Sequence, residues 1–178
     1  MGNLKYQNGK LEILDQRLLP NEVKWLPIVS KEAAFEAIQT LAVRGAPAIG
    51  IFAAFSMALF GKDDPAACKV YLDSARPTAV NLSWATARLA KVIKNGGDPV
   101  AEALAVQAED IEMCRKISAY GLSLLRDGDG LLTHCNAGEL ATSRYGTGLG
   151  PILLGKEKGY NFKVFSDETR PLLQGARL

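Results

Sequence analysis

The residues best able to do chemistry lie together in one short segment, which reads THCNAGELAT at positions 133–142. The apolar run before this segment predicts a strand, and the residues after it predict a helix. In open α/β sheets, ligands bind beyond the carboxyl ends of strands, where free N–H groups at helix starts attract anions and favour a thiolate. Cys135 is therefore a candidate catalytic thiol, although burial as a small core residue explains its position equally well.

His134 precedes this cysteine, which raises the question of a Cys-His nucleophile pair. Neighbouring residues on a strand point to opposite faces, so we expect a structural role for His134 instead. Asp167 and Glu168 follow the second predicted strand, where an acid can accept hydrogen bonds from sugar hydroxyls. A helix N-cap is the better interpretation of these two acids.

Two isolated arginines are candidates for binding a phosphate. Arg44 precedes glycine, alanine and proline at the start of an apolar stretch, where a charged side chain has no packing role. Arg76 precedes another proline between two predicted helices. A guanidinium can hold phosphate oxygens through paired hydrogen bonds, helped by N–H groups at a helix start. From position alone, capping the carboxyl end of a helix is an equally good interpretation of each arginine.

Several common cofactor and partner classes are disfavoured by composition. The 178 residues include three cysteines without CxxC spacing and a single histidine, which cannot build a common zinc site. The glycine-rich residues 146–150 lack GxGxxG spacing, and no P-loop is present. The net charge of +2 provides no field that would indicate nucleic-acid binding. We therefore expect no metal, no nucleotide cofactor and no nucleic-acid partner.

The chain also gives no indication of a membrane segment. Its longest nearly apolar run, residues 46–60, is shorter than the roughly 20 residues that a membrane-spanning helix needs. The first 16 residues contain no apolar signal core. Free thiols fit a reducing compartment, so we predict a cytoplasmic protein.

The sequence pattern of residues 1–126 predicts a small hairpin followed by a mainly helical domain. Asn8-Gly9 suits a type I′ turn. Ser30 caps a helix that ends before Arg44, and residues 48–60 form a buried helix. Further helices are predicted by three sequence signals: Asp64-Pro65, the apolar positions between 82 and 92, and Asp98-Pro99.

Residues 127–178 change to an alternating pattern. A strand at 131–134, a helix at about 139–158, a strand at 162–166 and a helix from about 169 predict a βαβ unit with a parallel sheet. This is the beginning of a Rossmann-like domain, so the fold class is α/β overall. Because a two-stranded parallel sheet is incomplete, we expect a further part of the protein to be missing or supplied by another chain.

Four separated segments resemble methylthioribose-1-phosphate isomerase. They are RGAPAIG at 44–50, RPTAVNL at 76–82, HCNAG with LAT at 134–142, and DETRPLLQGARL at 167–178. This family is related to regulatory subunits of a translation initiation exchange factor and to ribose-1,5-bisphosphate isomerase. The resemblance implies aldose–ketose isomerisation of 5-methylthioribose 1-phosphate in methionine salvage, by a homodimer without metal or nucleotide.

The resemblance also implies residue roles. The catalytic cysteine falls on Cys135, and the substrate-binding residues fall on Arg44, Gly45, Ala46, Arg76 and Gln174. Glu139 and Arg144 depart from the small residues that many members carry. The family's catalytic aspartate, in an Asp-Asn-Met segment, lies beyond residue 178, so we expect an inactive chain that needs a complementary C-terminal fragment. Alternatives are a regulatory module, or an isomerase of ribose 1,5-bisphosphate or 5-deoxyribose 1-phosphate.

Overall fold

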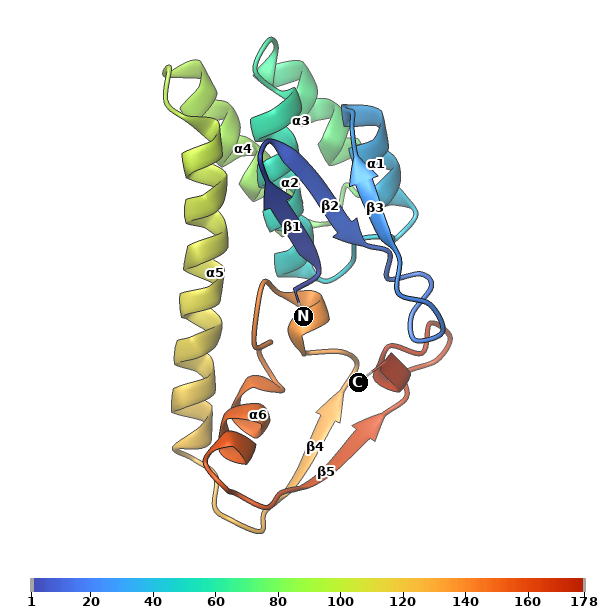
Figure 1. The fold of residues 1–178 in the computed structure, drawn as a ribbon, viewed down its shortest axis with the longest axis vertical. Coiled ribbons are helices and arrows are strands. Elements are labelled where there is room, and N and C mark those ends of the chain that lie inside the picture. Colours follow the sequence, from blue (N-terminus) through green and yellow to red (C-terminus); the bar gives the residue numbers. More distant parts are fainter. Residues whose placement is uncertain (1, 178) are drawn as a thin grey trace.

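A computed structural model describes residues 2–177, apart from the side chain of residue 177, and begins with a three-stranded antiparallel sheet (Figure 1). Its strands are β1 (Leu4–Gln7), β2 (Lys10–Leu14) and β3 (Trp25–Ile28), in the order β1-β2-β3. The hairpin predicted at Asn8-Gly9 is confirmed. Both turn residues have positive φ, 51° and 75°, as a type I′ turn requires. The third strand was not predicted, because it pairs with β2 across a ten-residue connection that contains no short turn signal.

Five helices follow the sheet. They are α1 (Lys31–Gln39), α2 (Ala46–Phe60), α3 (Pro65–Ser74), α4 (Val80–Lys94) and α5 (Pro99–Leu122). Three of the predicted starts are confirmed by side-chain caps, since Ser30, Asp64 and Asp98 each accept a backbone N–H from the first turn of their helix. The first helix ends at Gln39, earlier than expected, because Leu41 has a left-handed φ of 64°.

The hydrophobic core is built around α2, which is apolar on nearly every face. Phe52 and Phe55 on this helix are completely buried, and α2 packs against α3, α4, α5 and α1. The inner face of β2 adds Leu11 and Ile13. The buried residues of this cluster lie between Leu11 and Val106, so residues 2–122, called the N-terminal part below, contain the core.

Residues 123–177, called the C-terminal part below, form a βαβ unit, as predicted. Strands β4 (Gly130–His134) and β5 (Lys163–Asp167) are parallel, and α6 (Gly150–Glu157) lies between them in sequence and packs on α5 (Figure 1). The fold class is thus mixed α/β. The turn between α5 and β4 contains the predicted boundary at residue 126, and the division into two domains stays a prediction.

The prediction of a continuous helix over residues 139–158 is wrong for the first half of that range. A single 3₁₀ turn, η1 (Glu139–Ala141), is followed by a loop, and α6 begins only at Gly150. The loop folds back so closely that a Cβ on Gly146 would lie 2.5 Å from Gly138 Cα, and Gly146 has a φ of +81°. Gly146 and Gly148 therefore precede a helix, and Gly150 is its first residue. The predicted helix near residue 169 is also wrong, since only the short 3₁₀ turn η2 (Gly175–Arg177) forms there.

The C-terminal part buries little apolar surface. All five residues of β5 are exposed, including Val164 and Phe165, and Leu132 on β4 is 72% exposed. Between residues 123 and 176, no hydrophobic side chain that the structure describes is buried. None of the helices within the described residues is both long and apolar enough to cross a bilayer.

Candidate functional site

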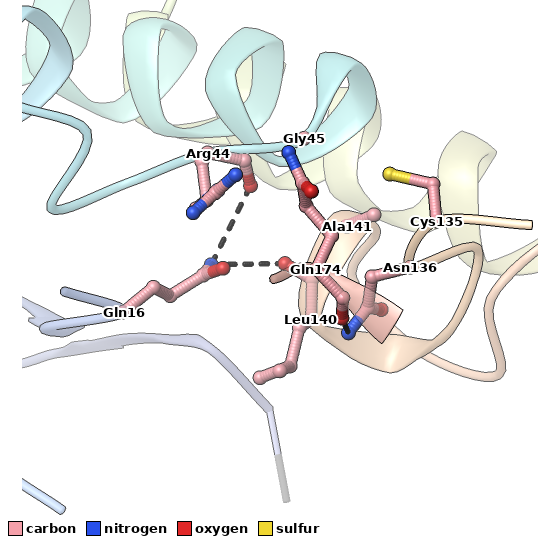
Figure 2. A pocket seen from close by; sticks show the side chains of 8 residues that line it. All are labelled: Gln16, Arg44, Gly45, Cys135, Asn136, Leu140, Ala141 and Gln174. Carbon is pink, nitrogen blue, oxygen red and sulfur yellow. Dashed lines mark hydrogen bonds between the residues drawn. The ribbon is translucent and has the colours of Figure 1, made fainter. Parts of the chain in front are cut away.

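A small pocket forms where the N-terminal part meets the C-terminal part (Figure 2). It has a volume of about 120 Å³. Its lining comes from five segments: the end of β2, the start of α2, the end of β4, η1 and the start of η2. The lining residues are Gln16, Arg44, Gly45, Cys135, Asn136, Leu140, Ala141 and Gln174. Four residues predicted from the sequence, Arg44, Gly45, Cys135 and Gln174, are thus brought together although they span 130 positions of the chain.

Arg44 and Gly45 provide the N-terminal wall of the pocket. Gly45 has a φ of +96°, which lets the chain turn directly into α2. A Cβ on this glycine would lie 2.5 Å from Ala141 Cα, so only glycine allows the start of α2 to approach η1 this closely. When the Gln174 amide is oriented so that its nitrogen donates to Thr169, its oxygen accepts a hydrogen bond from Arg44 Nη2 at 3.1 Å. Arg44 and Gln174 therefore form one polar surface.

Cys135 lies directly after β4 and is half-buried. Its φ of 63° turns the chain out of the strand, and its sulfur points toward the side of the pocket formed by Gly45 (Figure 2). The next residue, Asn136, holds this turn because its Oδ1 accepts the N–H of Gly138 at 3.2 Å. The other two cysteines, Cys68 and Cys114, are buried, and burial raises the pKa of both thiols. Of the three thiols, only that of Cys135 faces the pocket.

His134 takes no part in lining the pocket. Its Nδ1 lies 3.0 Å from Asp167 Oδ2, so the pair joins the ends of the two parallel strands, and the His134 side chain is 75% exposed. Glu168 pairs with Arg170. The expected N-cap role of Asp167 and Glu168 is wrong, because no helix follows them until Gly175.

Two of the predicted binding residues lie outside the pocket lining. Arg76 is in the turn between α3 and α4, where its backbone N–H donates to Asp73 O and its carbonyl accepts from Ala79. Ala46 is the first residue of α2 and is exposed. Within the described residues, no three His, Cys, Asp or Glu side chains converge as a metal ion would require.

Gln16 and Asn136 line the pocket but were not selected as candidates. Gln16 is 3% exposed, and its Nε2 donates to Leu140 O at 2.9 Å and to Arg44 O at 3.4 Å. Leu140 is 124 positions further along the chain, so local sequence could not indicate this contact. Asn136 carried a usable signal, because it lies within the strand-to-turn segment that points to ligand binding.

A family model described as "Initiation factor 2 subunit family" matches residues 42–178. The chain belongs to this family. Its curated relatives include the methylthioribose-1-phosphate isomerase of Symbiobacterium thermophilum, which is 52% identical over 94% of this chain and 52% of its own length. The 5-deoxyribose 1-phosphate isomerase of Petrotoga mobilis is 50% identical over 96% of this chain and 55% of its own length. The chain therefore spans about half the length of the curated relatives it matches.

Two solved structures share the fold of this chain. The 5-methylthioribose 1-phosphate isomerase of Pyrococcus horikoshii OT3 matches 99% of this chain and 55% of its own, with a TM-score of 0.87 and 36% identity. A structure titled translation initiation factor eIF-2B, subunit delta, from A. fulgidus matches 100% of this chain and 57% of its own, also with a TM-score of 0.87 and 36% identity. Backbone similarity is thus the same for a protein named as an enzyme and for one named as a translation factor subunit.

Proposed function

We propose that this chain carries part of the active site of a sugar-phosphate isomerase that converts 5-methylthioribose 1-phosphate into 5-methylthioribulose 1-phosphate. The observation that carries the proposal is the convergence of a guanidinium, an amide and a half-buried thiol on one pocket, from Arg44, Gln174 and Cys135. A cation beside a helix start suits a phosphate, and a thiol suits proton transfer. The names of the two isomerase relatives support the same substrate class.

The chemistry requires a ring opening and a hydrogen shift. The bond between C1 and the ring oxygen breaks, and the ring oxygen takes up a proton. Hydrogen is transferred from C2 to C1, and the C2 hydroxyl loses its proton as it becomes a ketone, so one proton is taken up and one is released. In the proposed roles, Arg44 holds the phosphate, Gln174 orients the sugar, and Cys135 moves a proton at C1 or C2. Gly45 lets the N–H groups at the start of α2 approach the phosphate. Ala46 and Arg76 are proposed to complete substrate binding from outside the pocket lining.

Substrate binding gives the direct test of this proposal. We expect 5-methylthioribose 1-phosphate to bind in calorimetry, and Arg44→Ala to weaken binding by about tenfold or more, because a hydrogen bond to a charged group contributes about 1.5–3 kcal/mol. Arg126→Ala is the matched control, since Arg126 is exposed in the turn after α5. Equal affinity of the Arg44 and Arg126 variants would show that the phosphate does not bind in this pocket.

Turnover is a separate question from binding. The sequence contains no Asp-Asn-Met segment, so we expect the 178-residue chain alone to bind the sugar phosphate without isomerising it. Adding a polypeptide that corresponds to the C-terminal half of a relative should start turnover, and Cys135→Ser should abolish it. Turnover by the chain alone would show that its own residues supply every proton transfer.

A regulatory module is the second candidate function, because the A. fulgidus translation factor subunit matches as well in backbone as the isomerase does. A regulatory module has no need of a thiol beside a phosphate-binding arginine, so failure to bind any pentose 1-phosphate would favour it. Comparing 5-methylthioribose and 5-deoxyribose 1-phosphates in the same assay decides between the two isomerase substrates. The proposal also includes a role in methionine salvage, a cytoplasmic location, a homodimer and a Rossmann-like sheet that continues β4 and β5.

A further inference from the structure

We propose that Asn3 is a positioning residue for this site, which holds η1 against the N-terminal sheet without lining the pocket itself. The role rests on the proposed function in one respect: a displaced η1 matters for ligand binding only if the pocket binds the sugar phosphate. In this proposal Asn3 does not contact the ligand, and it lies 136 to 139 positions before the backbone carbonyls that it contacts.

The side chain of Asn3 is directed at a single segment of backbone. Its Nδ2 donates to Leu140 O at 2.8 Å and to Thr142 O at 2.9 Å, and Glu139 O lies at 3.5 Å. An amide nitrogen has two hydrogens, and the two short bonds use both of them. Asn3 is only 5% exposed, and its own carbonyl accepts the N–H of Leu14 at 2.9 Å. The amide is therefore fixed to the sheet and bonded to η1.

The turn η1 has few hydrogen bonds within itself. As a 3₁₀ turn of three residues, it is closed by the bonds from Ala141 N to Gly138 O at 3.1 Å and from Thr142 N to Glu139 O at 3.3 Å. Gly138 provides no side-chain cap. The C-terminal part around it lacks a buried apolar cluster among the described residues. The carbonyls of η1 are instead bonded by amides from the N-terminal sheet, and Leu140 O accepts from both Asn3 and Gln16.

A displaced η1 would change the pocket directly. Ala141 lies so close to Gly45 that a Cβ there would be 2.5 Å from Ala141 Cα. Leu140 and Ala141 line the pocket beside Cys135 and Arg44. Loss of the Asn3 amide is therefore expected to move η1, and with it the wall of the pocket that Leu140 and Ala141 form.

The test compares Asn3→Ala and Asn3→Asp with wild type and with Asn95→Ala as the matched control, since Asn95 is exposed at the carboxyl end of α4. Asn3→Asp keeps the shape of the side chain and removes both donors. Affinity for 5-methylthioribose 1-phosphate is measured by calorimetry under conditions where denaturation curves show each variant to be folded. We expect both Asn3 variants to bind about three- to tenfold more weakly, because η1 loses two of the hydrogen bonds that hold it beside the pocket. Asn95→Ala should bind like wild type.

A second measurement separates this inference from the proposed function. Amide NMR signals of residues 139–143 and of Cys135 should shift in ligand-free Asn3→Ala and Asn3→Asp, while signals from the middle of α2 should stay in place. If wild type binds no sugar phosphate, the proposed function fails, and these shifts alone decide whether Asn3 positions η1. Wild-type affinity in both Asn3 variants, or unchanged signals at 139–143, would overturn the inference.

Discussion

The N-terminal and C-terminal parts of the chain are stabilised in different ways. The N-terminal part has a contiguous apolar core, in which Phe52, Phe55 and Ile13 are completely buried. The C-terminal part has regular strands and a helix, yet β5 is exposed along its whole length and Phe165 is 59% exposed. Secondary structure is therefore present in both parts, whereas a packed apolar core among the described residues is present in only one.

The pocket lies where these two parts meet, and this explains how its geometry is set. Arg44, Gly45 and Gln16 come from the part with the core, and Cys135 and Gln174 come from the part without it. Packing within the C-terminal part cannot fix the thiol relative to the guanidinium. The packing of α6 on α5, together with hydrogen bonds and close backbone contacts across the boundary, has to do so.

The largest expected difference is between two phenylalanine truncations. Phe52→Ala removes a completely buried ring from α2 and should lower the free energy of unfolding by about 3–5 kcal/mol. Phe165→Ala removes an exposed ring from β5 and should change it by no more than about 0.5 kcal/mol. Urea denaturation followed by circular dichroism measures both. Similar losses would show that the C-terminal part has a core of its own.

The next effect concerns the contact between the two parts. Gly45→Ala places a methyl group 2.5 Å from Ala141 Cα, in a left-handed conformation, and should lower the free energy of unfolding by about 1–3 kcal/mol. Gly96→Ala is the matched control, because Gly96 has a similar φ of +74° and nothing within 4 Å of an added Cβ. The control measures backbone strain alone. Only Gly45→Ala should also weaken sugar-phosphate binding, and equal binding by the two variants would mean that η1 moves without affecting the pocket.

Local sequence signals were sufficient for most of the N-terminal part. Asn8-Gly9 predicted the hairpin turn because both residues readily adopt positive φ. The helix starts were predicted from side chains whose oxygens accept N–H groups only a few residues away, namely Ser30, Asp64 and Asp98. These interactions involve neighbours in sequence, so composition and spacing reveal them. The parallel pairing of β4 with β5 was predicted from the alternation of strand, helix and strand along the chain.

Features that depend on distant residues were missed. The helix predicted from residue 139 does not begin until Gly150, since the loop folds back onto Gly138 and a Cβ on Gly146 could not fit. Gln16 was passed over because its partner Leu140 is 124 positions away. Position in the sequence made Arg44 and Cys135 candidates, and the family resemblance added Gln174. Their common pocket became visible only with the fold.

A smaller effect should stay within the N-terminal part. Asp98 caps α5 by accepting the N–H groups of Val100 at 2.9 Å and Ala101 at 3.3 Å. Asp98→Ala should lower the free energy of unfolding by about 1 kcal/mol, because those donors lose their partner. Affinity for the sugar phosphate should be unchanged, since the cap is not part of the pocket or its contacts with η1. A loss of affinity as large as that of Gly45→Ala would mean that strain at the start of α5 reaches the site.

The smallest effect tests a further hydrogen bond between the two parts through its pH dependence. Asp110 on α5 accepts the N–H of Ser143, two residues beyond η1, at 2.7 Å. Burial raises the pKa of this carboxyl above its usual 3.8, and the opposing hydrogen bond from Ser143 is the weaker influence. A raised pKa means that folding favours the protonated acid, so this contribution is present at low pH and is lost as pH rises through the folded-state pKa.

Asp110→Asn removes that titration and keeps an oxygen that can accept the Ser143 N–H. Denaturation of both proteins between about pH 7 and about pH 4 should show wild type gaining stability relative to Asp110→Asn as the pH falls. Affinity for the sugar phosphate should remain close to that of wild type, because the contact to residue 143 is retained. A relative loss of wild-type stability toward acid would show that the Ser143 N–H stabilises the charged carboxylate by more than burial destabilises it.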